Sequence, residues 1–102
     1  MKEEYINLEL VINEAGNRFE MIIDGYIAFI EYKQYPGKMA LLHTDVPPEL
    51  EVKGAATAII EKTLAWIENN KLALIPLCPV VVAYIKRHPG WKRMVTDEAT
   101  NI

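Results

Sequence analysis

The dipeptide Asp24-Gly25 constrains the fold of this 102-residue chain more than any other feature of the sequence. It stands between the apolar segments 21–23 and 26–30. An Asp-Gly pair in that setting is the strongest short-range signal of a β-hairpin. Pro36-Gly37 marks a second turn and leads into an extended segment over 38–46. The sequence therefore predicts at least three antiparallel strands in succession.

A further strand is predicted upstream of the first hairpin. Apolar and polar residues alternate from Ile6 to Asn13, which is the period of a half-buried strand. Turn-forming residues follow at 15–17, and an extended pattern resumes from Arg18 to Asp24. Residues 6–46 thus predict a four-stranded meander. Between the first two strands, residues 13–18 leave room for a turn and for no helix.

The periodicity changes after Pro47-Pro48. Apolar residues recur at helical spacing from Gly54 to Asn70, and the short apolar run 72–75 is typical of a buried strand that is central or parallel. Segment 79–87 is ambiguous, because its three valines favour a strand whereas Cys78-Pro79 favours the start of a helix.

The predicted fold class is α+β, with the order ββββαβα and both helices against one mostly antiparallel sheet. We expect a single domain over residues 1–102, with a core from about residue 6 to residue 95.

The composition of the chain argues against several classes of function. A net charge of −3 argues against nonspecific nucleic-acid binding, and the apolar run 72–85, broken by two prolines, is too short to span a bilayer. The single cysteine excludes an internal disulfide and is typical of a reducing compartment. With only two distant histidines, no standard zinc site is predicted. We expect a cytoplasmic protein without a metal, a membrane partner or a nucleic-acid partner.

Segment 46–57 is the first candidate for chemistry, because it predicts a strand, a loop and a helix that starts at Gly54. The first turn of a helix presents unbonded N–H groups and a positive dipole end, which can hold a pyrophosphate, and a glycine allows close approach. Most such junctions bind nothing, so a purely structural turn is the alternative.

The segment that contains His43 and Asp45 is the second candidate. Strand alternation predicts that both share a face with Leu41 and Met39. An imidazole exchanges protons near neutral pH, so His43 is a candidate general base. The alternative is a structural histidine that is hydrogen-bonded within the sheet, and Asp45 is favoured as a turn or cap residue.

Cys78 is the third candidate. It lies between Pro76 and Pro79, at a predicted strand end and a possible helix start, where the helix dipole would stabilise a thiolate. A buried cysteine that acts as a small apolar side chain is equally compatible with this position.

Taken together, these segments resemble the acetyl-CoA-binding core of the GNAT acetyltransferases. The resemblance covers about residues 8–95. It is strongest to a subgroup of minimal members of this chain's length, through three blocks: Leu41-Leu42-His43-Thr44-Asp45-Val46-Pro47, Pro76-Leu77-Cys78 and Tyr84-Ile85-Lys86-Arg87-His88-Pro89.

The resemblance implies a location for the co-substrate acetyl-CoA. In that superfamily strands four and five splay apart, and the pantetheine arm lies between them. The backbone of Thr44, Asp45 and Val46 would then pair with the pantetheine amides, and Cys78 would lie near the thioester, across from His43. The pyrophosphate would lie at the turn formed by Lys53, Gly54, Ala55, Ala56 and Thr57.

Three positions depart from the family pattern. Val52 stands where the subgroup commonly has a flexible glycine. Glu51 stands where the phosphate turn usually has Gln or Arg, and a carboxylate repels a pyrophosphate, although Lys53 would partly compensate. Tyr84 lies on the helix where larger members often place a tyrosine that protonates the departing thiolate. Its spacing is different here, which favours a core tyrosine.

The resemblance implies an N-acetyltransferase that moves an acetyl group from acetyl-CoA to an unidentified amine on a small molecule or a protein. Larger members wall the acceptor pocket with helices between strands one and two. Since this chain has no room for them, its acceptor side is expected to be open. The alternative is a degenerate GNAT-fold module that binds CoA or a protein partner without catalysis.

Overall fold

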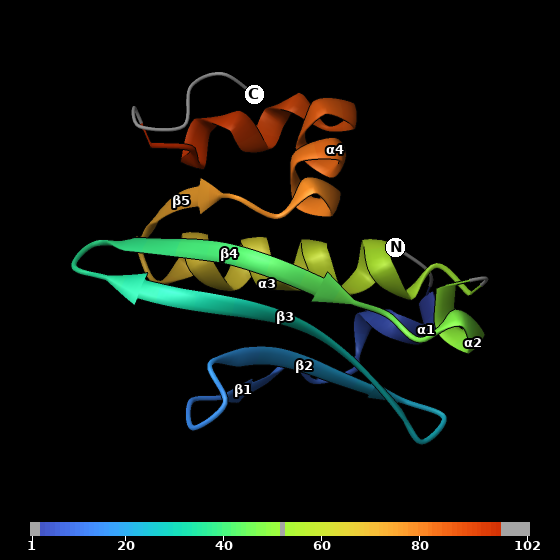
Figure 1. The fold of residues 1–102 in the computed structure, drawn as a ribbon. Coiled ribbons are helices and arrows are strands. Elements are labelled where there is room, and N and C mark those ends of the chain that lie inside the picture. Colours follow the sequence, from blue (N-terminus) through green and yellow to red (C-terminus); the bar gives the residue numbers. More distant parts are fainter. Residues whose placement is uncertain (1–2, 52, 97–102) are drawn as a thin grey trace.

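The computed structural model describes residues 3–51 and 53–96, which form one five-stranded sheet with helices (Figure 1). The strands lie in their sequence order, β1-β2-β3-β4-β5. The elements are α1 (Glu3–Ile6), β1 (Val11–Asn13), β2 (Arg18–Ile23), β3 (Tyr26–Tyr35), β4 (Lys38–Asp45), α2 (Pro48–Glu51), α3 (Ala55–Asn69), β5 (Ala73–Pro76), α4 (Pro79–Arg87) and the 3-10 helix η1 (Pro89–Met94).

The first four strands form the predicted antiparallel meander. Asp24 and Gly25 join β2 to β3 with φ angles of 52° and 82°, and two positive φ angles in a two-residue loop match the twist of a hairpin. At the second turn Gly37 has a φ of 71°. Residues 14–17 form the turn between β1 and β2, so the prediction of a turn without a helix at this position is confirmed.

The prediction of a strand from Ile6 to Asn13 is wrong in its first half. Residues 3–6 form the short helix α1, and β1 begins only at Val11. Tyr5 explains the difference, because its side chain is buried in the core and its hydroxyl donates to the carbonyl oxygen of Lys53 at 2.9 Å. A tertiary contact over 48 residues thus overrides the local alternation.

β4 and β5 are parallel, with Lys38 opposite Ala73 and Leu41 opposite Pro76. The prediction of a parallel strand at 72–75 is therefore confirmed. β5 is nevertheless the outermost strand of the sheet rather than a central one, and its free side bears the isolated bridge from Leu74 to Val95. α3 connects the two strands, because a parallel pair requires a long crossover.

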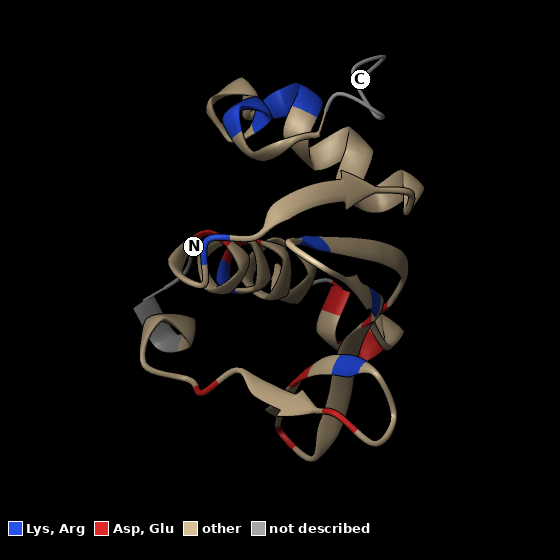
Figure 2. Ribbon diagram, turned by 90° about the vertical axis from the view of Figure 1, so that its left-hand side faces the viewer, with Lys and Arg blue, Asp and Glu red and all other residues tan. Residues whose placement is uncertain are grey.

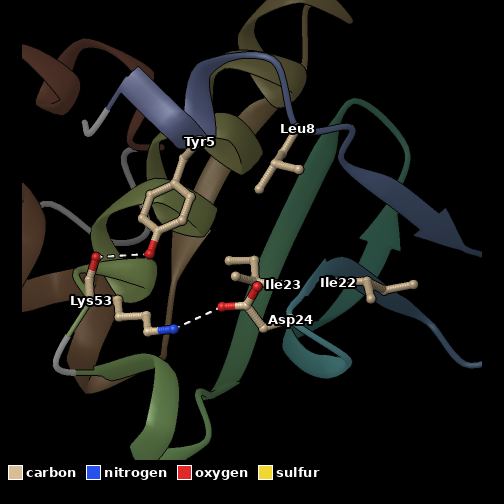
Figure 3. Close-up of a pocket in the computed structure, with 6 residues that line it drawn as sticks. All are labelled: Tyr5, Leu8, Ile22, Ile23, Asp24 and Lys53. Carbon is tan, nitrogen blue, oxygen red and sulfur yellow. Dashed lines mark hydrogen bonds and ion pairs between the residues drawn. The ribbon is translucent and has the colours of Figure 1, made fainter.

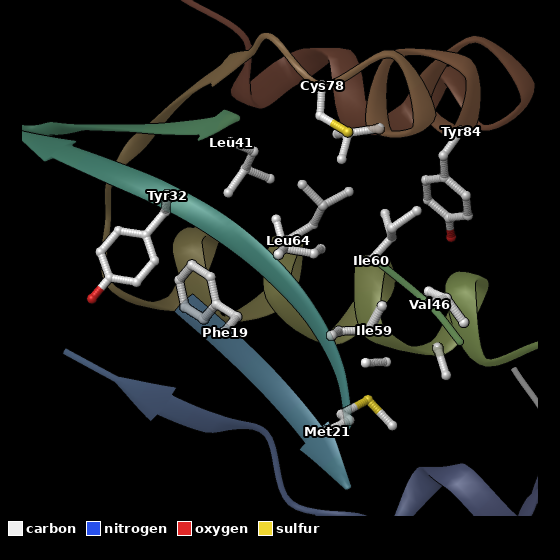
Figure 4. Packing of buried hydrophobic residues seen from close by; sticks show 14 of the residues in the cluster. Phe19, Met21, Tyr32, Leu41, Val46, Ile59, Ile60, Leu64, Cys78 and Tyr84 are labelled. Carbon is white, nitrogen blue, oxygen red and sulfur yellow. The ribbon is translucent and has the colours of Figure 1, made fainter. Parts of the chain in front are cut away.

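α3 and α4 share one core with the sheet (Figure 4). α3 begins and ends where its apolar periodicity predicts. The ambiguous segment is a helix, with Cys78 at the N-cap and Pro79 at the first helical position. Its valines do not form a strand, since Val81 is buried with Tyr84 and Ile85 at helical spacing.

A β-bulge interrupts the pairing of β3 with β4. Glu31 lies opposite His43 and Tyr32 lies opposite Leu41, which leaves Leu42 as an extra residue on β4. The prediction that His43 shares a face with Leu41 is therefore wrong, because the extra residue shifts the alternation by one position. Leu41 is fully buried and His43 is exposed.

Candidate functional site

β4 and β5 separate at a defined point. The last ladder pair joins Leu41 to Pro76, and the carbonyl oxygen of Leu41 then accepts from the N–H groups of both Leu77 and Cys78, at 3.0 and 2.9 Å. Beyond this point β4 continues to Asp45, paired with β3 alone, while the other chain segment turns into α4. The strands therefore diverge, as the resemblance to the GNAT acetyltransferases implies, and residues 42–45 present one edge to the gap.

The start of α3 provides the second part of the site. Gly54 is the N-cap and has φ 77° and ψ 21°, in the left-handed region. Among the described residues, no side chain caps this helix end. The N–H groups of Ala55, Ala56 and Thr57 belong to the first turn, where a helix lacks internal acceptors. Such a turn suits a pyrophosphate, both by its N–H donors and by the helix dipole.

Lys53 does not point its charge at this helix end. Its ammonium group lies 2.7 Å from a carboxylate oxygen of Asp24, in the β2–β3 hairpin, and its carbonyl oxygen accepts the hydroxyl of Tyr5. These three residues border a cavity of about 350 Å³ together with apolar side chains (Figure 3). α1 and the hairpin thus brace the turn, and no local pattern around Tyr5 or Asp24 predicts this.

Cys78 is buried, with 1% of its surface exposed, and belongs to the core cluster. Its Sγ lies 3.3 Å from the hydroxyl oxygen of Thr44 on β4. The sulfur makes no capping bond to α4, although the residue occupies the N-cap position. The structure therefore joins Cys78 to Thr44, at the point where the two strands diverge.

His43 lies on the opposite face of β4. Since neighbouring side chains of a strand point to opposite faces and Thr44 points to Cys78, His43 points away from it. The imidazole is exposed and its ring lies edge-on to Phe29, with 6.4 Å between the centroids. His43 and Cys78 do not form a catalytic pair in this arrangement, because β4 separates them.

Tyr84 has the core role that its spacing predicts. It is 1% exposed, and its hydroxyl donates to a carboxylate oxygen of Glu61 at 2.6 Å. Burial and this bond raise the pKa of Tyr84 above its ordinary value. The bond connects α4 to α3, and the hydroxyl proton is donated to Glu61 rather than to another acceptor.

The face of the sheet that carries His43 has exposed apolar side chains, among them Ile22, Ile27 and Leu42. On β2 the carboxylate of Glu20 accepts from Arg18 and from Asn13, and these bonds lower its pKa. The Arg18 guanidinium stacks 3.9 Å from the ring centroid of Phe29. Hydrogen bonds thus connect β1 to β2, and the contacts of the Phe29 ring with Arg18 and with His43 continue the link through β3 to β4.

Remaining site residues lie where β4 leaves the sheet. Asp45 is exposed at the end of the strand, and Val46 packs into the core. Glu51 is exposed at the end of α2, a helix that the sequence does not predict, and precedes Gly54 by three residues.

A comparison with known protein families identifies the family of this chain. A family model described as GCN5-related N-acetyl-transferase matches residues 18–94, from the first residue of β2 to the last residue of η1. The chain therefore belongs to the GCN5-related N-acetyl-transferase family. The fold agrees, since it is an α+β domain whose fourth and fifth strands are parallel and then diverge.

The described residues 3–51 and 53–96 include no helix that is long and apolar enough to cross a membrane. They also include no group of three or more His, Cys, Asp or Glu residues that is arranged to hold a metal ion.

Proposed function

We propose that this protein is an N-acetyltransferase that uses acetyl-CoA as its co-substrate. The observation that carries the proposal is the divergence of β4 from β5 after Leu41, next to a helix start without a side-chain cap. The pantetheine arm would occupy the gap and pair with the backbone of Thr44, Asp45 and Val46. The pyrophosphate would bind at Gly54, Ala55, Ala56 and Thr57.

The reaction is a direct transfer. The nitrogen of an unprotonated acceptor amine attacks the thioester carbonyl carbon, so that a C–N bond forms, the C–S bond breaks and CoA leaves as its thiolate. N–H groups on the free edge of β4 would stabilise the developing oxyanion. His43 is the proposed base for the amine proton, because it lies on the face that no inserted helix covers.

Cys78 is proposed to line the thioester pocket. Its burial and its contact with Thr44 support this role better than that of a nucleophile, since no base faces the sulfur among the described contacts. A thiol there still admits a covalent route, in which the sulfur accepts the acetyl group and then passes it to the amine.

A module that binds CoA without catalysis is the second candidate. It is favoured by one observation, namely that the Tyr84 hydroxyl is bonded to Glu61 and does not serve as an acid for the leaving thiolate.

One experiment separates these functions. The protein is titrated with acetyl-CoA and with CoA while the amide signals of residues 54–57 are followed by NMR, and then incubated with a panel of amines for mass analysis. Shifts at the turn together with an acetylated amine are expected. Shifts without product would favour the non-catalytic module. If millimolar acetyl-CoA changes neither these signals nor the melting temperature, the cofactor proposal is wrong.

A further inference from the structure

A cavity of about 420 Å³ lies beside the point where β4 and β5 separate. It spans the last three strands of the sheet and is lined by Tyr35, Pro36, Lys38, Ala40, Ile75 and Leu77. All of these except Lys38 are apolar or aromatic, so the cavity suits an uncharged carbon chain better than a charged group.

The alternation of side chains along β4 shows on which face of the sheet this cavity lies. Met39 and Leu41 belong to the core, so Ala40 between them points to the opposite face. Ile75 is the partner of Ala40 in the parallel ladder and points the same way. The bulge shifts the alternation by one residue, which brings His43 to the same face as Ala40. The cavity and the imidazole of His43 are therefore open to the same side of the sheet.

The cavity borders the closed end of the gap between β4 and β5. The pair of Ala40 with Ile75 comes directly before the last ladder pair of the two strands. Leu77 lines the cavity, and its N–H group and that of Cys78 both donate to the carbonyl oxygen of Leu41. Cys78 is the residue proposed to line the thioester pocket, so its neighbour in the chain forms a wall of the cavity. The following inference rests on the proposed function.

An acyl chain longer than acetyl has one free direction at this closed end. It cannot continue between the strands, because β4 and β5 are paired there. The core side is filled, since Leu41 and Cys78 are buried in the same cluster as Leu64 (Figure 4). The opposite face presents the cavity, where Leu77 is 59% exposed. A chain that leaves the thioester on that face would cover apolar surface that is otherwise in contact with water.

We propose that this cavity holds the acyl chain of the co-substrate, and that the protein binds propanoyl-CoA and butanoyl-CoA more tightly than acetyl-CoA. The chain would lie toward Ala40 and Ile75, while the acceptor amine approaches the carbonyl carbon from the side of His43. The transfer is unchanged, because only the carbon chain of the thioester differs: the C–N bond forms, the C–S bond breaks and CoA leaves as its thiolate. Each added methylene should strengthen binding roughly threefold, slightly less than its full burial would give.

The test is calorimetric titration of the wild-type protein and its variants with acetyl-CoA and with butanoyl-CoA. The wild type should bind butanoyl-CoA roughly tenfold more tightly, because two more methylene groups are buried. Ala40→Leu should reduce this preference to less than about twofold and keep the affinity for acetyl-CoA, since the larger side chain occupies the cavity. Ala73→Leu is the matched control. It makes the same substitution on the neighbouring strand, opposite Lys38 and outside the cavity lining, and should keep the preference.

Leu77→Ala keeps the test decisive if the larger side chain of Ala40→Leu disturbs the sheet. Leu77 is exposed, so its truncation should leave the fold intact, which circular dichroism verifies. The variant lacks one apolar wall of the cavity, so its preference for butanoyl-CoA should fall about threefold while acetyl-CoA binds as in the wild type.

Three results would overturn the inference. Equal affinity of the wild type for the two ligands, or tighter binding of acetyl-CoA, would refute it and leave the proposed function intact. A preference for butanoyl-CoA that survives in both Ala40→Leu and Leu77→Ala would show that the chain lies elsewhere. Failure of the wild type to bind either ligand would refute the inference and the proposed function together.

Discussion

Cys78 and Thr44 meet across the point where β4 and β5 part, and this contact bears on the chemistry of the site. The sulfur is buried and its partner is a hydroxyl, whereas His43 points to the other face of the strand. A thiol without a facing base is a poor nucleophile, because only the thiolate attacks a thioester readily.

We predict that Cys78→Ala retains most of the acetyltransferase turnover. It should lower the free energy of unfolding by about 1 kcal/mol, because it leaves a small void in the core. Turnover is measured with acetyl-CoA and the best amine of a panel, and stability by urea unfolding. Cys78→Ser is the control for the loss of the contact with Thr44. Accumulation of acetyl-protein in the wild type, together with loss of turnover in Cys78→Ala, would instead establish the covalent route.

At the scale of elements, the start of α3 depends on a backbone conformation that residues other than glycine rarely adopt. Gly54 has a φ of 77°, and Gly37, in the hairpin between β3 and β4, has a similar φ of 71°. The two glycines therefore form a matched pair, one at the proposed phosphate turn and one outside it.

We predict that Gly54→Ala and Gly37→Ala each lower the free energy of unfolding by about 1 kcal/mol, because alanine is strained in the left-handed region. Gly54→Asn should cost less, since asparagine tolerates this region better. Only Gly54→Ala should also weaken CoA binding in folded protein, as measured by calorimetry. Equal CoA affinities for the two alanine variants would argue against a phosphate at this turn.

The bond between Tyr84 and Glu61 couples α4 to α3 and leads to a pH-dependent prediction. Burial raises the pKa of Tyr84 in the folded state, so the folded protein keeps this proton at a pH where the unfolded chain has lost it. The contribution of Tyr84 to stability is thus complete below about pH 10 and is lost as the pH rises further, by up to about 1.4 kcal/mol per pH unit.

Tyr84→Phe should therefore flatten the fall in stability above about pH 10, as followed by urea unfolding between pH 8 and 11. Tyr35→Phe, at an exposed position, is the control and should leave the wild-type slope. Parallel curves for the wild type and Tyr84→Phe would contradict the role assigned to this bond. Turnover of Tyr84→Phe should be close to that of the wild type, because the hydroxyl faces Glu61.

Most elements of this fold are encoded locally. Asp24-Gly25 adopts the two positive φ angles that its sequence predicts, and Pro79 occupies the first helical position of α4. The bulge at Leu42 is not encoded in this way, since no local signal such as a glycine marks it in β4. It depends on how β3 and β4 align over their whole length, and it changes the face on which His43 lies.

The candidate site was predictable only in part for the same reason. The turn at Gly54 follows from one glycine between a strand and a helix, whereas the divergence of β4 and β5 is implied by the resemblance to the GNAT acetyltransferases. The ion pair of Lys53 with Asp24 and the bond from Tyr5 join segments that are far apart in the chain, so no local pattern reveals them.

At the scale of the whole molecule, charge is divided between the two parts of the chain. Residues 5–51 carry eight carboxylates and three Lys or Arg, whereas residues 71–96 carry five Lys or Arg and no carboxylate. Figure 2 shows the acidic positions on the strands and hairpins, away from the basic α4 and η1. The acidic part includes the sheet face on which the proposed acceptor would approach.

We therefore predict that cationic acceptors are preferred. With an aliphatic diamine and a monoamine of equal length, the KM of the diamine should be several-fold lower at low salt, because its second ammonium group is attracted to the strands. The difference should fade as salt shortens the Debye length from about 10 Å at 0.1 M to about 3 Å at 1 M.

Glu31 provides the sharpest variant for this test, because it lies directly opposite His43 in the register of β3 and β4 and so projects from the same face. Glu31→Gln should raise the KM of the diamine more than that of the monoamine and leave kcat nearly unchanged. Glu9→Gln, which removes a charge before β1, is the control for net charge alone. Equal KM values for the two amines in low salt would show that the acidic strands do not select the acceptor, and acceptor choice would then rest on the exposed apolar side chains of that face.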